Sequence, residues 1–191
     1  MKKIIAIVVA LVVVLGVFAA CGGEKTPETP AGPAYADAVE VLSTIFGAYA
    51  EENAFPVAGG DEAHMDWENP GPGKYDIALA DELNVVAKLP ASQAANIEDA
   101  ATALHMMNAN SFTGAAYKLV AGTDAAAFAA EFKAELDNAR WMCGFPEKFV
   151  VLQSGDYVVT AFGVADIMDY FKTTVSGLEG FTVVLEGDIV A

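Results

Sequence analysis

Cysteine and histidine are scarce in this chain, and their scarcity excludes several common kinds of site. Its 191 residues include 2 Cys and 2 His. A structural zinc site needs about four Cys or His ligands at short spacings, and these residues do not supply them. The sequence also contains no recognisable Ser–His–Asp or Cys–His arrangement and no glycine-rich phosphate loop. We therefore expect no catalytic residues, no cofactor and no metal, and a protein that is not an enzyme.

Basic residues are scarce as well. The chain has 10 Lys and Arg against 26 Asp and Glu, which gives a formal net charge of −16 at pH 7. A surface of this sign repels nucleic acid and anionic lipid headgroups. No nucleic-acid partner is expected, and solubility explains the acidity more simply than mimicry of an acidic ligand does.

No apolar run is long enough to cross a membrane comfortably. The longest one, residues 4–18, has about 15 residues and follows Lys2 and Lys3, as the apolar region of a signal peptide does. Removal of these two lysines with the signal would leave 8 basic and 26 acidic residues, a net charge of about −18.

The end of this run resembles the bacterial lipobox, in which small residues precede a cysteine. The matching segment is Phe18-Ala19-Ala20-Cys21, with Phe18 where Leu is usual. The resemblance implies that residues 1–20 are a lipoprotein signal peptide and that the Cys21 thiol is lipidated. Two or three acyl chains hold a protein stably on a membrane, because each buried CH₂ adds about 0.8 kcal/mol. The alternatives are an ordinary secretory signal with a chance cysteine, and a retained transmembrane helix.

Residues 21–34 lack large apolar side chains and contain three prolines and three glycines. They cannot form a core, and we predict that they are a flexible tether. Residues 35–191 have the length of one domain, which we expect to be a single, monomeric globular unit. With Cys21 lipidated, Cys143 has no partner for an intramolecular disulfide. We interpret Cys143 as a small buried hydrophobe rather than a nucleophile.

Periodicity predicts helices and strands along the rest of the chain. Helices are expected over 35–49, 81–89, 123–141 and 166–177, and strands over 75–80, 112–121, 149–153, 156–162 and 181–190. Residues 92–108 are ambiguous, because their alanines favour a helix whereas residues 101–107 could alternate as a strand. Asp37 and Thr123 are the expected N-caps of two helices, and Ser154-Gly155 is the expected turn of a β-hairpin.

The order of these elements predicts an α+β fold, with an antiparallel sheet and helices packed on one face. Its core is β-β-α-β-β-α-β, preceded by an N-terminal helix. The helix over 123–141 carries one apolar stripe, which must be buried. Since sequential elements usually neighbour each other, we expect the stripe to pack on the adjacent hairpin. The predicted contacts join Phe128, Phe132 and Leu136 to Val151, Val159 and Ala161.

The segment 51–74 is a long loop that is rich in carboxylates. Six of them lie between residues 51 and 68, namely Glu51, Glu52, Asp61, Glu62, Asp66 and Glu68. They could bind calcium, but they lack the Asp-x-Asp-x-Asp-Gly order of an EF-hand loop, and a solvated loop is the simpler interpretation. His64 has no spaced partner in this loop, and His105-Met106-Met107 is only a weak pattern for a soft metal.

Residues 96–175 resemble a family of unknown function found in small cell-surface lipoproteins of clostridial-type bacteria. The likeness rests on the order of parts: a Met-rich strand at Met106-Met107-Asn108, a second strand over 112–120, a charged helix, and a Phe145-Pro146-Glu147 link. A strand pair then closes around Ser154-Gly155-Asp156-Tyr157, where the family has a Lys-Gly-Asn-Tyr-like turn. The resemblance implies a lipoprotein and a strand over 101–107, and it implies no activity.

Three hypotheses for the function follow. The first is a non-enzymatic binding or accessory module, attached to the extracytoplasmic face of the cell membrane through lipidated Cys21. The second is a small-ligand-binding protein that serves a transporter. The third is a hydrolase that uses carboxylates, such as Asp156 or Asp166 with Glu147. A hydrolase of that kind needs two carboxylates roughly 5–9 Å apart around the scissile bond.

Overall fold

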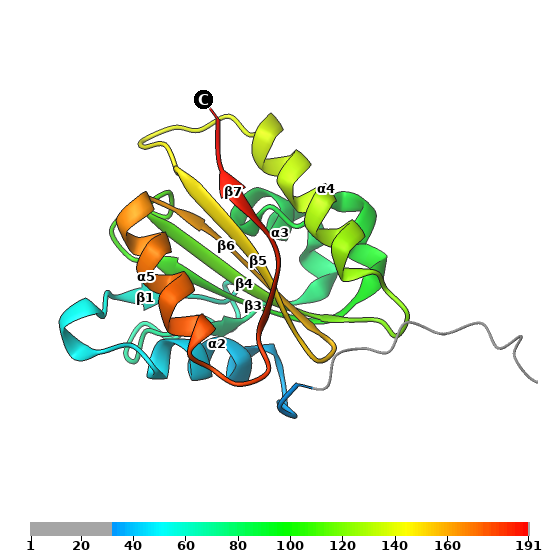
Figure 1. The fold of residues 1–191 in the computed structure, drawn as a ribbon, viewed down its shortest axis with the longest axis horizontal. Helices are drawn as coiled ribbons and strands as arrows, with labels where there is room; N and C mark the ends of the chain where they lie inside the picture. Colours follow the sequence, from blue (N-terminus) through cyan, green and yellow to red (C-terminus); the bar gives the residue numbers. More distant parts are fainter. Residues whose placement is uncertain (1–31, 191) are drawn as a thin grey trace, which may run out of the picture.

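The strands of the described residues all belong to one antiparallel sheet. The computed structural model describes residues 32–190, and its sheet has 7 strands in the order β1-β3-β4-β6-β5-β7, with β2 also paired to β3 (Figure 1). The strands are β1 (Val57–Ala58), β2 (Gly73–Lys74), β3 (Ile97–His105), β4 (Phe112–Leu119), β5 (Lys148–Ser154), β6 (Tyr157–Gly163) and β7 (Thr182–Asp188). The helices are α2 (Ala38–Gly47), α3 (Ala80–Ala87), α4 (Ala125–Asn138) and α5 (Ala165–Ser176).

The predicted α+β class and the predicted order of elements are confirmed. From β3 onward the chain runs β-β-α-β-β-α-β, and α2 precedes it. Asp37 caps α2 as expected, since its Oδ1 accepts a hydrogen bond from the Glu40 N–H at 2.9 Å. The ambiguous segment is the strand β3, preceded by a 3₁₀ helix over Ala91–Asn96. Its alanines are buried between the sheet and the helices, Ala100 on one face and Ala101 and Ala103 on the other.

The helices cover both faces of the sheet, so the predicted one-sided packing is wrong. One buried cluster joins α3 and α4 to the sheet, and a second joins α2 and α5 to its opposite face. Figure 1 shows α3 and α4 on one side of the strands and α2 and α5 on the other. The physical reason lies in β4, β5 and β6, which are buried at nearly every position. Strands buried on both faces lose the polar alternation that marks a solvated side.

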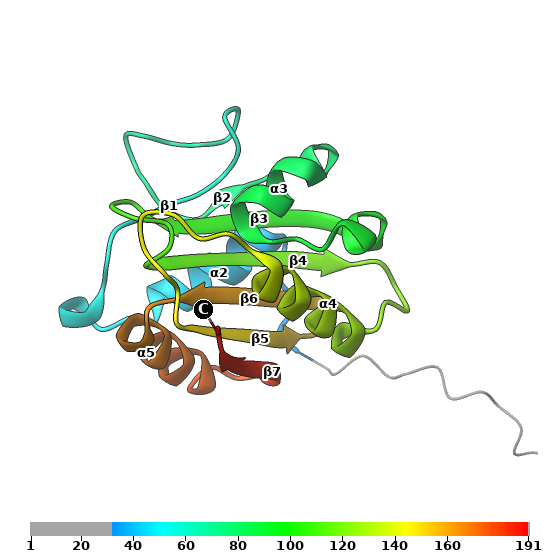
Figure 2. The same cartoon turned by 90° about the horizontal axis from the view of Figure 1, so that it is seen from above.

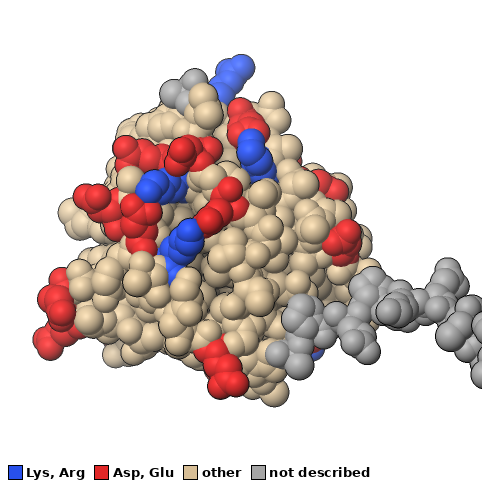
Figure 3. Space-filling view, in the orientation of Figure 1, with Lys and Arg blue, Asp and Glu red and all other residues tan. Residues whose placement is uncertain are grey.

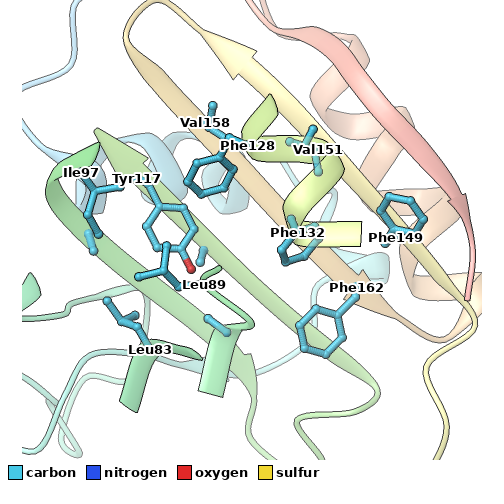
Figure 4. Close-up of a cluster of buried hydrophobic side chains, with 14 of the residues drawn as sticks. Leu83, Leu89, Ile97, Tyr117, Phe128, Phe132, Phe149, Val151, Val158 and Phe162 are labelled. Carbon is cyan, nitrogen blue, oxygen red and sulfur yellow. The ribbon is translucent and has the colours of Figure 1, made fainter. Parts of the chain in front are cut away.

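The stripe of α4 packs on the central hairpin, but only one of the three predicted hairpin residues is correct. Phe128, Phe132 and Leu136 are buried in the same cluster as Val151. Val159 and Ala161 face the other side, toward α2 and α5. Their neighbours Val158 and Phe162 contact the stripe instead (Figure 4). A shift of one residue along a strand reverses the face that a side chain occupies.

Four local boundaries also differ from prediction. Residues 75–80 are not a strand, because the β2 pairing ends at Lys74 and a 3₁₀ helix spans Ile77–Leu79. Asp124, not Thr123, caps α4, since its Oδ1 accepts a hydrogen bond from the Ala126 N–H at 2.8 Å. That helix ends at Asn138, before the predicted 141. The hairpin turn lies one residue later than predicted, because Ser154 pairs with Tyr157.

Candidate functional site

A hollow lies at the end of β3, on the α3 side of the sheet. Its volume is about 570 Å³, within the usual range for small-molecule sites. Four segments line it: the end of β1 with the loop after it, Tyr75 just after β2, Val86 of α3, and the end of β3 with the residues that follow. Most of the lining is apolar, and it includes Met65, Trp67, Tyr75, Leu104, Met106 and Met107.

Pairing of both short strands with β3 creates this hollow. β1 pairs with β3 at Leu104 and His105, and β2 pairs with it at Ala101 and Thr102. The chain between β1 and β2 therefore leaves the sheet edge and returns to it, as a loop that extends beyond the sheet in Figure 2. We call residues 59–72 the edge loop. Trp67 and Met65 lie on this loop and reach the cavity from its outer side.

Two glycines permit the close approach of the backbone at the base of the edge loop. A Cβ on Gly59 would lie 1.7 Å from the carbonyl oxygen of Thr102, and one on Gly73 would lie 2.2 Å from that of Gly59. Any side chain at either position would therefore collide with the backbone. The adjacent Gly60 N–H donates to Thr102 Oγ1 at 2.9 Å, which ties the start of the loop to β3.

Asp61 holds the edge loop in place. Only 4% of its surface is exposed. Its Oδ1 accepts hydrogen bonds from the Ala63 N–H at 2.9 Å and the His64 N–H at 3.1 Å, and its Oδ2 accepts from the Asp76 N–H at 2.7 Å. Burial alone would raise the pKa of this carboxyl group, but these hydrogen bonds and His64 outweigh it and lower the pKa. Asp61 is therefore an ionised structural anchor.

Asp61 and His64 form a carboxylate–imidazole pair beside the cavity. Asp61 Oδ1 lies 2.7 Å from His64 Nδ1. Such a pair can orient a general base, but it then needs a nucleophile or a bound water positioned by other groups. Among the described residues that line the cavity, none is a serine, threonine, cysteine or lysine, and His64 itself is not among them. The role of this pair in holding the edge loop is therefore sufficient to account for it, and no catalytic role is needed.

The side chains around the cavity mouth are unusually exposed for their type. Trp67 is 74% exposed, Met107 83% and Met106 45%. The wall behind them is the buried Tyr75, whose hydroxyl lies 3.4 Å from Glu82 Oε2. Burial, and then the Glu82 carboxylate, raises the pKa of Tyr75 and keeps it a hydrogen-bond donor. Large apolar groups left in water beside a hollow are characteristic of a binding surface.

The charge of the cavity lining is negative. Asp61 and Glu62 line it, whereas no Lys or Arg does so among the described residues. Asp61 uses its oxygens on the edge loop, but Glu62 forms no hydrogen bond or ion pair with the part of the chain that the structure describes. Several lysines elsewhere have acidic partners. Figure 3 shows lysines and carboxylates gathered where α5 meets β7, consistent with the Lys148–Asp169 pair at 2.7 Å and the Lys172–Glu186 pair at 2.5 Å.

The structure does not gather the acidic loop residues into a metal site. Within residues 32–190, no group of three or more His, Cys, Asp or Glu side chains is placed to hold a metal ion. His105 stacks on Phe55 with ring centroids 5.4 Å apart, and its Nδ1 accepts the Met107 N–H at 3.1 Å. Met106 and Met107 contribute to the cavity lining rather than to a recognisable metal site.

Cys143 is exposed, so its predicted burial is wrong. It lies in the link after α4 with a φ of 63°, a conformation that turns the chain and leaves the thiol outside the core. Two asparagine side chains stabilise this turn by donating hydrogen bonds to its carbonyl groups. The Asn108 side-chain amide donates to the Cys143 carbonyl at 2.8 Å, and that of Asn110 donates to the Met142 carbonyl at 2.7 Å.

Asp156, one of the carboxylates that could have served a hydrolase, does not share a site with Glu147. Asp156 lies in the turn after β5, at the end of the hairpin opposite Glu147. The Oε2 of Glu147 accepts the Ala165 N–H at 2.7 Å and so caps the start of α5. Asp166 is exposed in the first turn of the same helix. The pairing of Asp156 with Glu147 is thus excluded by distance along the strands.

Two large apolar residues in the edge loop were a sequence signal for this cavity. Trp67 and Met65 stand in a polar, proline- and glycine-rich loop, where large apolar side chains are otherwise rare.

Cys21 and residues 1–31 lie outside the described part of the chain. Within that part, no helix combines the length and the apolar character needed to cross a membrane. Comparison with family models, curated proteins and solved structures finds no significant match. The resemblance to the clostridial-type lipoprotein family stays a prediction.

Proposed function

We propose that this protein is a lipid-anchored, non-enzymatic binding module on the extracytoplasmic face of a bacterial cell membrane, and that it binds a small ligand in the cavity beside β3. The observation that carries the proposal is a hollow of about 570 Å³ whose mouth exposes Trp67 and Met107 to water. Apolar side chains of this size contribute to binding when a ligand removes them from water. The lipobox-like segment before Cys21 supports the membrane anchor.

The position of the cavity suits an anchored protein. The tether enters the domain near the β5–β6 turn, since the Tyr35 ring lies 5.9 Å from that of Tyr157. The start of β3 is at the same end of the sheet, because Ile97 pairs with Leu119, whose N–H donates to the carbonyl of Asp156. The cavity is at the other end of β3, roughly 30 Å away for a strand of this length. The cavity would thus lie far from the point where the tether joins the domain.

The anchor is tested by metabolic labelling with a clickable fatty acid. The wild-type protein is expected to become labelled, and Cys21→Ser is expected not to, because the thiol is the acceptor of the acyl group. Cys143→Ser is the matched control and should label like the wild type. Equal labelling of wild type and Cys21→Ser would contradict the anchor.

The cavity is tested with N-phenyl-1-naphthylamine, a neutral apolar dye that fluoresces when it leaves water. The tested protein is residues 21–191 with Cys21→Ser, which carries no acyl chains. It is expected to bind the dye. Ala109→Trp places a large side chain in the lining and should abolish the signal, whereas Ala78→Trp, on an exposed position away from the cavity, should not. Equal dye binding by both variants would refute the cavity as the site.

A further inference from the structure

We propose that the ligand of this cavity is a small organic cation, with an ammonium group attached to an apolar body. The inference rests on the proposed function and names the chemical class that the same site selects. It is motivated by the coincidence of three features at one mouth: an unpaired carboxylate, an exposed indole ring and several thioether side chains. Each feature favours a positive or polarisable group, and none favours an anion.

The carboxylate is that of Glu62. It lines the cavity and has no hydrogen-bond or ion-pair partner among the described residues. Asp61 adds a second negative charge beneath the edge loop, while no Lys or Arg lines the cavity within residues 32–190. An anionic ligand would thus meet uncompensated repulsion there. A cation would meet attraction, and the strongly acidic chain, with its net charge of −16, would favour the approach of a cation from solution.

The aromatic and sulfur groups complete the match. An ammonium ion over an indole face gains a cation–π interaction, which is strongest for tryptophan. Trp67 is 74% exposed and lines the mouth, so its surface is accessible to such a group. Met65, Met106 and Met107 are flexible and polarisable and can close around an apolar body of variable shape. Leu104 and Val86 provide the inner apolar wall.

The size of the hollow selects a small molecule over a macromolecule. A cavity of about 570 Å³ accommodates a drug-sized compound, whereas a stable protein partner needs roughly 800 Å² of interface on each side. An extended peptide would also need a free strand edge at the mouth. β3 has none over residues 101–105, apart from Ala103, because β1 and β2 pair with it there.

The test compares three probes that share a phenylalkyl body and differ in charge: phenethyltrimethylammonium, 3-phenylpropanol and 3-phenylpropionate. Isothermal titration calorimetry of residues 21–191 with Cys21→Ser should give affinities that decrease in that order. The cation should bind about tenfold more tightly than the alcohol. Raising the salt concentration from 20 mM to 500 mM should weaken binding of the cation, because screening reduces charge attraction. Binding of the alcohol should change little.

Two substitutions localise the effect. Glu62→Gln should weaken binding of the cation about threefold and leave the alcohol unchanged, as expected for an exposed charge. Its matched control is Glu68→Gln, which removes the same charge from the same loop at a residue that does not line the cavity. Trp67→Leu keeps an apolar side chain but removes the indole face, and should weaken binding of the cation about tenfold and that of the alcohol less.

The outcomes separate the two levels of the proposal. Preference for the cation, reduced by Glu62→Gln and by Trp67→Leu but kept with Glu68→Gln, supports the ligand class. Equal binding of all three probes, or tightest binding of the carboxylate, overturns the ligand class and leaves the cavity as a binding site. Binding of none of the probes, together with no dye binding by the unsubstituted chain, overturns both the ligand class and the proposed function.

Discussion

Asp61 illustrates how a residue of a type that is normally exposed becomes part of the structure. A buried carboxylate without partners is very costly, but three backbone N–H groups donate to this one. These donors belong to the edge loop itself and to the chain just after β2. The charge therefore stabilises the loop conformation that forms the outer wall of the cavity.

Asp61→Asn is expected to lower the free energy of unfolding by about 1–3 kcal/mol near neutral pH, since the amide cannot accept every hydrogen bond that the carboxylate accepts. The folded pKa of Asp61 is lowered, so its contribution is complete above the ordinary value of 3.8 and is lost as the pH falls through the folded pKa. Urea denaturation at a series of pH values should show wild type and variant converging in acid.

The control for this experiment is Glu68→Gln, which removes an exposed carboxylate from the same loop and should change stability by less than about 0.5 kcal/mol. A difference between wild type and Asp61→Asn that stays constant down to the lowest pH would mean that the charge of Asp61 has no part in the stability of the loop.

At the scale of elements, the packing of α4 on the central hairpin depends on the alternation of side chains along β5 and β6. Phe149 and Val151 point toward α4, whereas Val150 and Leu152 point toward α2 and α5. Both sets are apolar and buried. The sequence pattern therefore identifies the strands but does not distinguish their two faces.

Phe132→Ala is expected to destabilise the protein by about 3–5 kcal/mol, because it removes a fully buried ring from the α4 interface. Its ring centroid lies 6.3 Å from that of Phe149 and 6.5 Å from that of Phe162. Urea denaturation measures the change. Lys133→Ala, one position along the helix, removes only a surface pair with Asp137 and should cost less than about 0.5 kcal/mol. Similar effects of the two substitutions would place the stripe outside the core.

At the scale of the whole molecule, one sheet holds two cores. Its opposite faces are each covered by two helices, and no strand lies outside the sheet in the part of the chain described here. The two cores share the same strands, so neither can open without exposing the apolar residues of β4, β5 and β6. We expect residues 35–191 to unfold as one cooperative unit.

Limited proteolysis tests this expectation. A protease of broad specificity should first remove the segment that precedes Tyr35 and leave a stable fragment, because the following residues pack on the domain. Mass spectrometry of the fragments identifies the cut sites. Early cuts within residues 149–162, the central hairpin, would show that the two cores do not form a single unit.

The sequence alone was sufficient for the features that depend on neighbouring residues. Alternation identified β4 and β7, apolar runs around a tight turn identified β5 and β6, and Asp37 revealed the start of α2. The order of elements predicted an α+β fold. Local patterns carry this information because caps, turns and periodicity are set within a few residues. The exact turn and the cap of α4 were missed by one residue each, since adjacent Ser154-Gly155-Asp156 and Thr123-Asp124 offer equivalent chemistry.

Only the tertiary structure decided which face each side chain occupies and where the cavity lies. β1 and β2 have two residues each, too few to show a period, and they exist because β3 supplies their hydrogen-bonding partners. Their pairing makes the edge loop, and the loop brings Trp67 toward Met107, far along the chain. Asp61 is buried for the same reason, because its hydrogen-bond donors converge only after the loop has closed on the sheet.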